Sequence, residues 1–183
     1  MTMVDNAESI SGSQPDVVDV LLAQHRLVRE LMTEVSDGHG EARQRAFDEL
    51  RTLLALHEAA EESIVHPAAH GEVAEARVAE EEHAARAIAR LESLDLSSEA
   101  FDQAFAEFAQ AVLAHADKEE REEFPALRQG TPSRTLQEMA DRVVSGQEDA
   151  YAQMGGDPVG ATAVTAEPFA ARLDEASSAM ESH

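Results

Sequence analysis

The sequence predicts an all-α protein, an up-down-up-down four-helix bundle with a C-terminal helical extension. Apolar residues recur at helical spacing through four consecutive segments that short turns separate. The chain is 43% hydrophobic but only 4% aromatic, a balance that suits close-packed helices better than a sandwich or a barrel. No stretch of the sequence shows the apolar and polar alternation of a half-buried strand.

The bundle is expected to occupy residues 16–129, after a disordered segment of polar and small residues at 1–15. Its four helices are predicted at about 16–36, 41–65, 72–94 and 97–127. Gly38 and Gly40 end the first helix, and Pro67 lies at the end of the second. Ser97 is a suitable N-cap for the fourth. Short turns between consecutive helices imply that neighbouring helices run antiparallel.

The C-terminal extension, residues 130–183, is expected to hold a helix and a partly disordered tail. Pro132 predicts the start of a fifth helix, at its first helical position, which runs to about Met154. A shorter helix is predicted around Phe169 to Met180. The fifth helix has an apolar face that favours packing against its own bundle, so we expect a monomer, with a weak homodimer as the alternative. This face consists of Leu136, Met139, Val143, Val144 and Tyr151.

Charge and composition exclude several classes of function. The net charge is −23 and Lys118 is the sole lysine, so a binding surface for nucleic acid is not expected. The same charge would repel anionic membranes, and the sequence shows neither a membrane span nor a signal peptide, which favours a cytoplasmic protein. Because the chain has no cysteine, any metal must be bound by His and carboxylate side chains.

A duplicated pattern is the main functional signal in the sequence. Three residues recur 58 positions later, and the two sets are His25, His57 and Glu61, then His83, His115 and Glu119. In both copies 32 positions lead from the first His to the second, and four more lead to the Glu. A single His-x-x-x-Glu match means little in a chain with 37 acidic residues. Two copies in register indicate a duplicated helical hairpin.

The repeat has a spatial meaning in a bundle. In each hairpin the two His residues lie at similar distances, roughly 20–25 Å, from the shared turn, so they are nearly level. The ligand candidates fall on the apolar stripe of their helices and face the interior. Buried imidazoles and carboxylates are costly unless they are paired or bind a metal. For one copy alone, a structural His or an ion pair is the simpler interpretation; two copies at one level favour a metal site.

These residues resemble the hemerythrin-like family, the HHE cation-binding domains. The likeness covers about residues 16–128 and includes the proline after each pair, Pro67 and Pro125. It implies a hemerythrin-like bundle that holds two non-haem irons with an oxo or hydroxo bridge. The resemblance assigns one iron to His25 and His57, the other to His83 and His115, and the bridging carboxylates to Glu61 and Glu119. Ligand chemistry agrees without choosing the metal, because imidazole and carboxylate suit Fe, Mn and Zn alike.

Function would reside at metal positions that the protein leaves free. Each ion would have about four protein ligands, fewer than octahedral iron requires. We therefore expect the site to bind or react with a small oxidant, namely hydrogen peroxide, dioxygen or nitric oxide. The most concrete activity is catalase-like or peroxidase-like turnover, and no general acid or nucleophile accompanies the metal site. The alternatives are an oxygen, nitric oxide or iron sensor, an iron store without turnover, and a purely structural acidic bundle whose histidines are incidental.

The chain departs from the oxygen-carrying hemerythrins at two positions. They resemble it but carry a fifth His one turn after the third-helix ligand, where this chain has Ala87. They also carry an Asp five residues after the fourth-helix His, where this chain has Glu120. The repeat favours Glu119 as the bridge and leaves Glu120 as the alternative; otherwise Glu120 is expected to be solvated, or to orient a ligand His. The missing His argues against reversible oxygen carriage and favours a more open site.

The remaining histidines and the Glu-x-x-His pattern do not indicate a second metal site. His66 aligns with Phe124 in the repeat and is expected to pack at the helix boundary or to support a ligand. His39 and His183 are expected to be solvated. The Glu-x-x-His pattern of ferritin-like di-iron bundles occurs only at Glu80 to His83, which disfavours a site of that kind.

Overall fold

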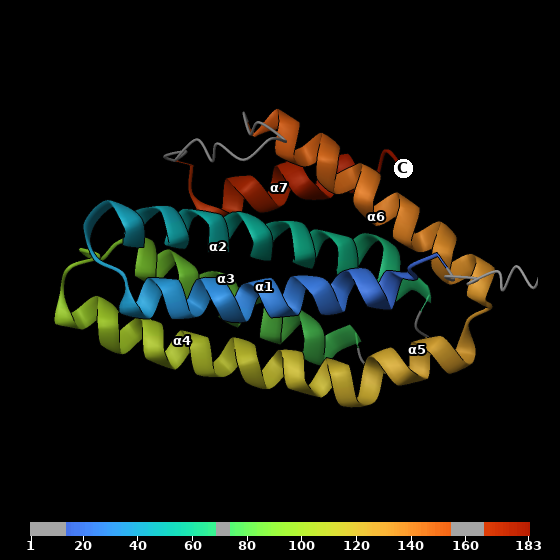
Figure 1. The fold of residues 1–183 in the computed structure, drawn as a ribbon, viewed down its shortest axis with the longest axis horizontal. Helices are drawn as coiled ribbons and strands as arrows, with labels where there is room; N and C mark the ends of the chain where they lie inside the picture. The colour runs from blue at the N-terminus through green and yellow to red at the C-terminus, as the bar shows by residue number, and fades with distance from the viewer. Residues whose placement is uncertain (1–13, 69–73, 155–166) are drawn as a thin grey trace, which may run out of the picture.

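The computed structural model describes residues 14–68, 74–154 and 167–183, and the elements in these ranges are helices (Figure 1). The predicted all-α class is therefore confirmed. The segment 1–15, predicted to be disordered, lies almost wholly outside the described residues, and so does the linker after Met154. None of the helices in the described ranges combines the length and the apolar character that crossing a bilayer requires.

Helices α1 to α4 lie along the length of the molecule, α5 continues the line of α4, and α6 runs obliquely to them (Figure 1). The α-helices in the described residues are α1 (Val17–Asp37), α2 (Gly40–Ala60), α3 (Ala74–Glu92), α4 (Glu99–Lys118), α5 (Phe124–Gly130), α6 (Ser133–Gln153) and α7 (Phe169–Met180). A π-helical turn, η1 (Glu61–Val65), and a 3₁₀ turn, η2 (His66–Ala68), follow α2. A second π-helical turn, η3 (Glu119–Glu123), joins α4 to α5. α1 packs against α2, α4 and α6, α3 packs against α4, and α7 packs against α2 and α6.

The first helix begins and ends where its sequence directs. The Asp16 carboxylate accepts a hydrogen bond from the Asp19 N–H at 3.0 Å, and the Asp19 carboxylate accepts one from the Asp16 N–H at 3.0 Å. At the other end, a Cβ on Gly38 would lie 2.4 Å from the Glu34 carbonyl oxygen. Gly40 has φ of 55°, a conformation that L side chains rarely adopt. The two glycines therefore permit the tight turn into α2.

Two helix starts differ from the prediction by one residue. Ser98, not Ser97, caps α4, because the Ser98 hydroxyl accepts the Phe101 N–H at 3.1 Å. The Ser97 hydroxyl instead donates to the Asp95 carboxylate at 2.7 Å. Pro132 is the N-cap of α6 with ψ of 140°, so the helix begins one residue later than predicted.

Two apolar clusters form the core and meet at the level of His25 and His57. Along α1, Leu21 belongs to the first cluster and Val28 to the second, with His25 between them. The second cluster contains the stacked and edge-on rings of the predicted aromatic stripe, which are Phe101, Phe105 and Phe108, together with Phe47. His25 and His57 therefore form a polar layer between the two apolar clusters.

The apolar face predicted for α6 packs within the chain. Leu136, Met139 and Val143 are buried in the first cluster, and Tyr151 packs against it. Val144 was also predicted on this face, but 41% of its surface is exposed. Successive helix residues differ by about 100° in direction, so Val143 and Val144 cannot both face the same partner.

A buried ionic network holds α7 against α2. Arg172 is only 2% exposed; its Nη1 donates to the Asp48 carbonyl oxygen at 3.0 Å, and its Nη2 lies 3.3 Å from the Asp48 carboxylate. Arg51 pairs with Asp48 and with Glu92 of α3. The Phe169 N–H, at the start of α7, donates to Glu92 at 2.7 Å. The C-terminal helix is thus part of the packed helical body.

Candidate metal centre

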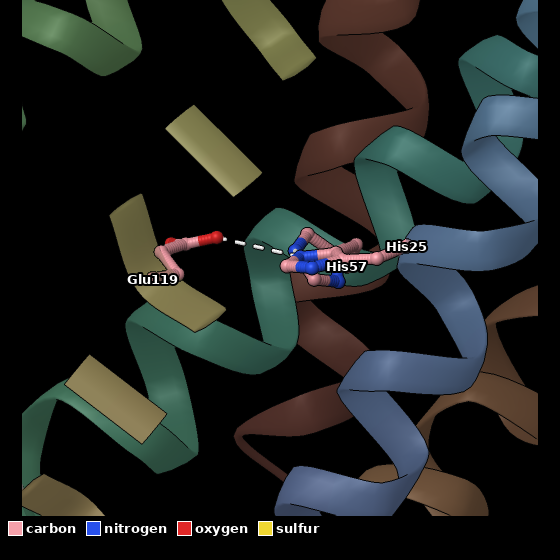
Figure 2. A group of neighbouring side chains, drawn as sticks. All are labelled: His25, His57 and Glu119. Carbon is pink, nitrogen blue, oxygen red and sulfur yellow. Dashed lines mark hydrogen bonds and ion pairs between the residues drawn. The ribbon is translucent and has the colours of Figure 1, made fainter. Parts of the chain in front are cut away.

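The predicted ligands come from α1 to α4 and from the two π-helical turns. Their positions are His25 in α1, His57 in α2, Glu61 in η1, His83 in α3, His115 in α4 and Glu119 in η3. Five of them converge in two groups, within each of which the ligand atoms lie within 4.8 Å of one another. One group holds His25, His57 and Glu119 (Figure 2), and the other holds Glu61, His115 and Glu119. The shared Glu119 joins the two groups.

The imidazoles of His25 and His57 meet in the buried interior, with their Nε2 atoms 3.2 Å apart. His25 Nδ1 lies 2.9 Å from a carboxylate oxygen of Glu120. His57 Nδ1 lies 2.9 Å from the amide oxygen of Gln24. An oxygen acceptor at each Nδ1 favours the ring proton there, and with both protons on Nδ1 the two Nε2 lone pairs face each other. This pair is unfavourable on its own and fits a bound cation.

Glu119 is the shared carboxylate and is 1% exposed. Its Oε1 lies 3.0 Å from His115 Nε2, and its Oε2 lies 3.4 Å from His25 Nε2. Oε2 is buried without a hydrogen-bond partner among the described residues. Glu61, 2% exposed, has Oε1 3.6 Å from His57 Nε2. A buried carboxylate oxygen without a hydrogen bond, aimed at an imidazole lone pair, is a second feature that fits a cation.

Burial and neighbouring charges set the protonation of these groups. Burial, with His25 close by, lowers the pKa of His57 to about 3, so the ring is neutral at pH 7. Burial and the charge of Glu119 raise the pKa of Glu61 well above its usual range. Burial also disfavours the charged form of Glu119, but the hydrogen bond and the charge of His115 outweigh burial and lower the pKa of Glu119. Without a cation, the two carboxylates therefore favour a total charge of −1, with Glu61 neutral and Glu119 charged.

Both His-x-x-x-Glu pairs lead into a π-helical turn that begins at the Glu itself. η1 begins at Glu61 and η3 at Glu119, at the same 58-residue offset as the ligands. The N–H that follows each turn donates to the carbonyl oxygen of that Glu, one residue further back than in an α-helix. Pro67 and Pro125 come next, and in a regular helix the proline ring would clash with the carbonyl four residues earlier. The wider turn relieves that clash, and such turns are frequent at functional sites.

His83 stands apart from the two groups. It is exposed on α3 and lies in the wall of a cavity of about 880 Å³ that His25, His57 and His115 also line. Most of the cavity surface is apolar and comes from α3 and α4, including Ala84, Ala87, Ile88, Phe108 and Val112. The structure thus places the four predicted His ligands around one cavity, although the two close groups contain only three of them.

Glu120 lies beside a predicted ligand His, which is one of the two places expected for it. It is not simply solvated, because it lies 2.9 Å from His25 Nδ1 and accepts a hydrogen bond from Arg29 Nη1 at 3.0 Å. Burial disfavours its charge, but these hydrogen bonds outweigh burial and lower the pKa of Glu120. Glu119 faces both ligand groups, whereas Glu120 holds the far nitrogen of His25. The geometry therefore favours Glu119 over Glu120 as the bridging carboxylate.

Sequence reasoning missed Gln24 and Gln147, which support His57 from α1 and α6. The one available signal was that Gln24 precedes a predicted ligand. Of the other histidines, His66 lines the cavity. His39 is exposed as expected, whereas His183 pairs with Asp149 at 2.8 Å. His70 lies outside the described residues.

Comparisons with known proteins point the same way as this geometry. The family model described as the hemerythrin HHE cation-binding domain matches residues 16–127, more than half of the chain. A comparison with curated proteins gave no match. The chain is similar to the crystal structure of a hemerythrin HHE cation-binding domain-containing protein from Mycobacterium kansasii, with a TM-score of 0.70 and 22% identity, over 88% of this chain and 99% of that one. At this identity the structural likeness shows the fold. Because the family model matches more than half of the chain, the chain belongs to the hemerythrin HHE cation-binding domain family.

Proposed function

We propose that the protein is a non-haem di-iron protein of the hemerythrin type. The observation that carries the proposal is the 3.2 Å approach of His25 Nε2 to His57 Nε2, with both Nδ1 atoms facing oxygen acceptors. One iron would be held by His25 and His57 and the other by His83 and His115, with Glu61 and Glu119 as bridging carboxylates. The helices α1 to α4, within residues 16–129, would form the up-down-up-down bundle that positions them.

The two oxygens of Glu119 support two cations rather than one. Oε1 points to His115 at 3.0 Å and Oε2 points to His25 at 3.4 Å, so the carboxylate lies between two separate imidazole groups. Glu61 lies between them as well, since it neighbours His57 and shares a group with His115. A carboxylate with one oxygen toward each neighbour is suited to bridging a pair of metals.

His83 is included because of the repeat and the cavity. It occupies in the second copy the place that His25 occupies in the first, 58 residues earlier. It also lines the same cavity as the other three imidazoles. Imidazole and carboxylate donors suit iron, manganese and zinc, and the resemblance to hemerythrin-like proteins favours iron.

The proposed activity is binding of, or reaction with, hydrogen peroxide, dioxygen or nitric oxide. The cavity beside the ligands is large enough for such molecules, and the His115 side chain is 41% exposed, so they can reach the site. Ala87 lines this cavity where oxygen-carrying hemerythrins have a further His, which keeps the approach open. A bridged pair of irons supplies redox cycling and exchangeable ligand positions. Catalase-like turnover is therefore the activity we propose first.

A sensor or iron store without turnover is the second candidate. The observation that favours it is the hydrogen bond between Gln147 of α6 and Gln24, the partner of His57, because this contact connects the site to the C-terminal region. In such a protein the C-terminal helices would report metal or ligand occupancy to a partner.

Iron reconstitution followed by peroxide separates these candidates. The loaded protein should contain about two irons per chain and absorb in the near ultraviolet as bridged ferric pairs do. Sustained oxygen evolution on an oxygen electrode, lost in His115→Ala and His83→Ala, supports the enzyme. Binding of peroxide or nitric oxide without turnover supports the sensor or store. A folded, colourless protein that retains no iron after reconstitution contradicts both.

A further inference from the structure

A chain of three hydrogen bonds links α6 to the His25 and His57 group. Gln147 Nε2 donates to the Leu56 carbonyl oxygen at 3.3 Å. Gln24 Nε2 donates to Gln147 Oε1 at 2.8 Å. The amide oxygen of Gln24 lies 2.9 Å from His57 Nδ1. This series of hydrogen bonds begins at the backbone carbonyl of Leu56 in α2 and passes through α6 and α1. It ends at the side chain of His57, the next residue of α2.

The direction of these hydrogen bonds follows from their first acceptor. A backbone carbonyl can only accept, so the amide nitrogen of Gln147 must face Leu56 and its oxygen must face Gln24. Gln24 then presents its nitrogen to Gln147 and its oxygen to His57. An oxygen at this position accepts the ring proton from Nδ1, which leaves His57 Nε2 unprotonated and turned toward His25. The backbone carbonyl of Leu56 thereby determines, through the two glutamines, which nitrogen of His57 carries the proton.

Close packing of α7 against α6 holds the segment of α6 that carries Gln147. The preceding residue, Gly146, is buried, and a Cβ there would lie 2.5 Å from the Met180 sulfur of α7. The missing side chain lets α7 lie directly against α6 at this level. Arg172 in turn ties α7 to Asp48 of α2. The family match ends at residue 127, so Gln147 belongs to the part of the chain that lies beyond it.

We propose that Gln147 is a positioning residue of the metal site, which acts through Gln24 to hold His57 as the tautomer protonated on Nδ1. The C-terminal region is then a working part of the site, because its α6 selects which nitrogen of His57 faces the metal. The proposal rests on the proposed function in taking His57 as a ligand. It concerns the state of the ring before any metal binds, so it can be tested separately.

The tautomer of His57 in the metal-free protein is the direct test. In protein labelled with ¹⁵N-histidine, two-bond proton-nitrogen spectra distinguish the two tautomers, and the spectrum of His57→Gln identifies the His57 signals. The wild type should show His57 protonated on Nδ1. Gln147→Met, similar in size but without the amide, should give a mixture of tautomers, as should Gln24→Met. The double variant should resemble either single variant, since each substitution interrupts the same series of hydrogen bonds.

Gln153→Met is the matched control, because Gln153 is exposed on the same helix. It should leave the His57 signals unchanged. Far-ultraviolet circular dichroism checks that each variant is folded, and Gln147→Asn, whose amide is too short to reach both partners, replaces Gln147→Met if that variant does not fold. A wild-type ring protonated on Nε2, or a folded Gln147 variant that keeps the wild-type tautomer, overturns the proposal.

Metal affinity gives the second readout. Loss of a hydrogen-bond partner behind a ligand His lowers metal affinity roughly 10–100-fold, so Gln147→Met should weaken iron(II) binding by that factor and Gln153→Met should not. Equal affinities for wild type and Gln147→Met would also overturn the proposal. If the wild type binds no metal, the proposed function fails, while the tautomer measurement still decides the role of Gln147.

Discussion

His25 Nε2 and His57 Nε2 lie 3.2 Å apart, and each ring has an oxygen acceptor at its other nitrogen. Two unprotonated nitrogens at this distance repel each other, whereas a cation between them is bound by both. The acceptors Glu120 and Gln24 therefore hold the two rings in the orientation that turns their Nε2 atoms toward each other.

Glu120→Ala should lower metal affinity about 10–100-fold, because His25 loses the partner that keeps its proton on Nδ1. Competition with a coloured chelator measures the change. Glu122→Ala is the control, since Glu122 is an exposed glutamate in the same π-helical turn. An affinity for Glu120→Ala within about twofold of the control would show that Glu120 does not position His25.

Glu61→Ala and Glu119→Ala should each reduce the metal content of the purified protein. Both carboxylates are buried beside the imidazoles, and removal of either takes away an anionic donor. Elemental analysis against the Glu122→Ala control provides the measurement. Full metal loading in both variants would contradict the assignment of these residues as bridges.

Arg172→Met should lower the free energy of unfolding by about 3–5 kcal/mol, because it leaves the Asp48 carboxylate buried with one fewer partner. Arg172 and Asp48 are 2% and 3% exposed. Arg134→Met is the control, since that side chain is 90% exposed and pairs with Glu138 of its own helix. Urea unfolding measures both variants. Equal losses would indicate that the network does not fasten α7.

Arg128→Ala should destabilise the protein at neutral pH but not in acid. Burial disfavours the Asp16 charge, but hydrogen bonds from Arg128 outweigh it and lower the pKa of Asp16 below its ordinary value of 3.8. The stabilisation is thus fully present above pH 3.8 and is lost as the pH falls through the lowered pKa. We expect about 0.5–1 kcal/mol at pH 7, since both side chains are partly exposed to solvent. Unfolding curves over a pH series check this, and a difference independent of pH would contradict it.

Much of the fold could be predicted from two periods in the sequence. Apolar residues recur about every 3.6 residues along each helix, and the ligand pattern recurs after 58 residues. The helical period identified the buried faces, such as Leu21, Val28 and Phe105. The repeat identified His25 and His57 as neighbours although 32 residues separate them. Local chemistry was less decisive at α4, where two adjacent serines could both cap the helix and only one does.

The supporting contacts could not be predicted in the same way. Gln147 and Gln24 are 123 residues apart and meet only because α6 packs beside α1, so no local pattern marks them. The π-helical turns have no period of their own, although Pro67 and Pro125 at equal distances after each Glu were a signal for them. The exposure of His83 depends on how α3 lies against α4, which helical periodicity does not determine.

The most direct test of the central claim is anomalous diffraction at the iron edge from crystals of the iron-loaded protein. The account predicts two anomalous peaks in the buried layer, one bound by His25 and His57 and the other by His83 and His115, with the carboxylates of Glu61 and Glu119 between them. A single peak, or peaks away from these six side chains, would contradict it.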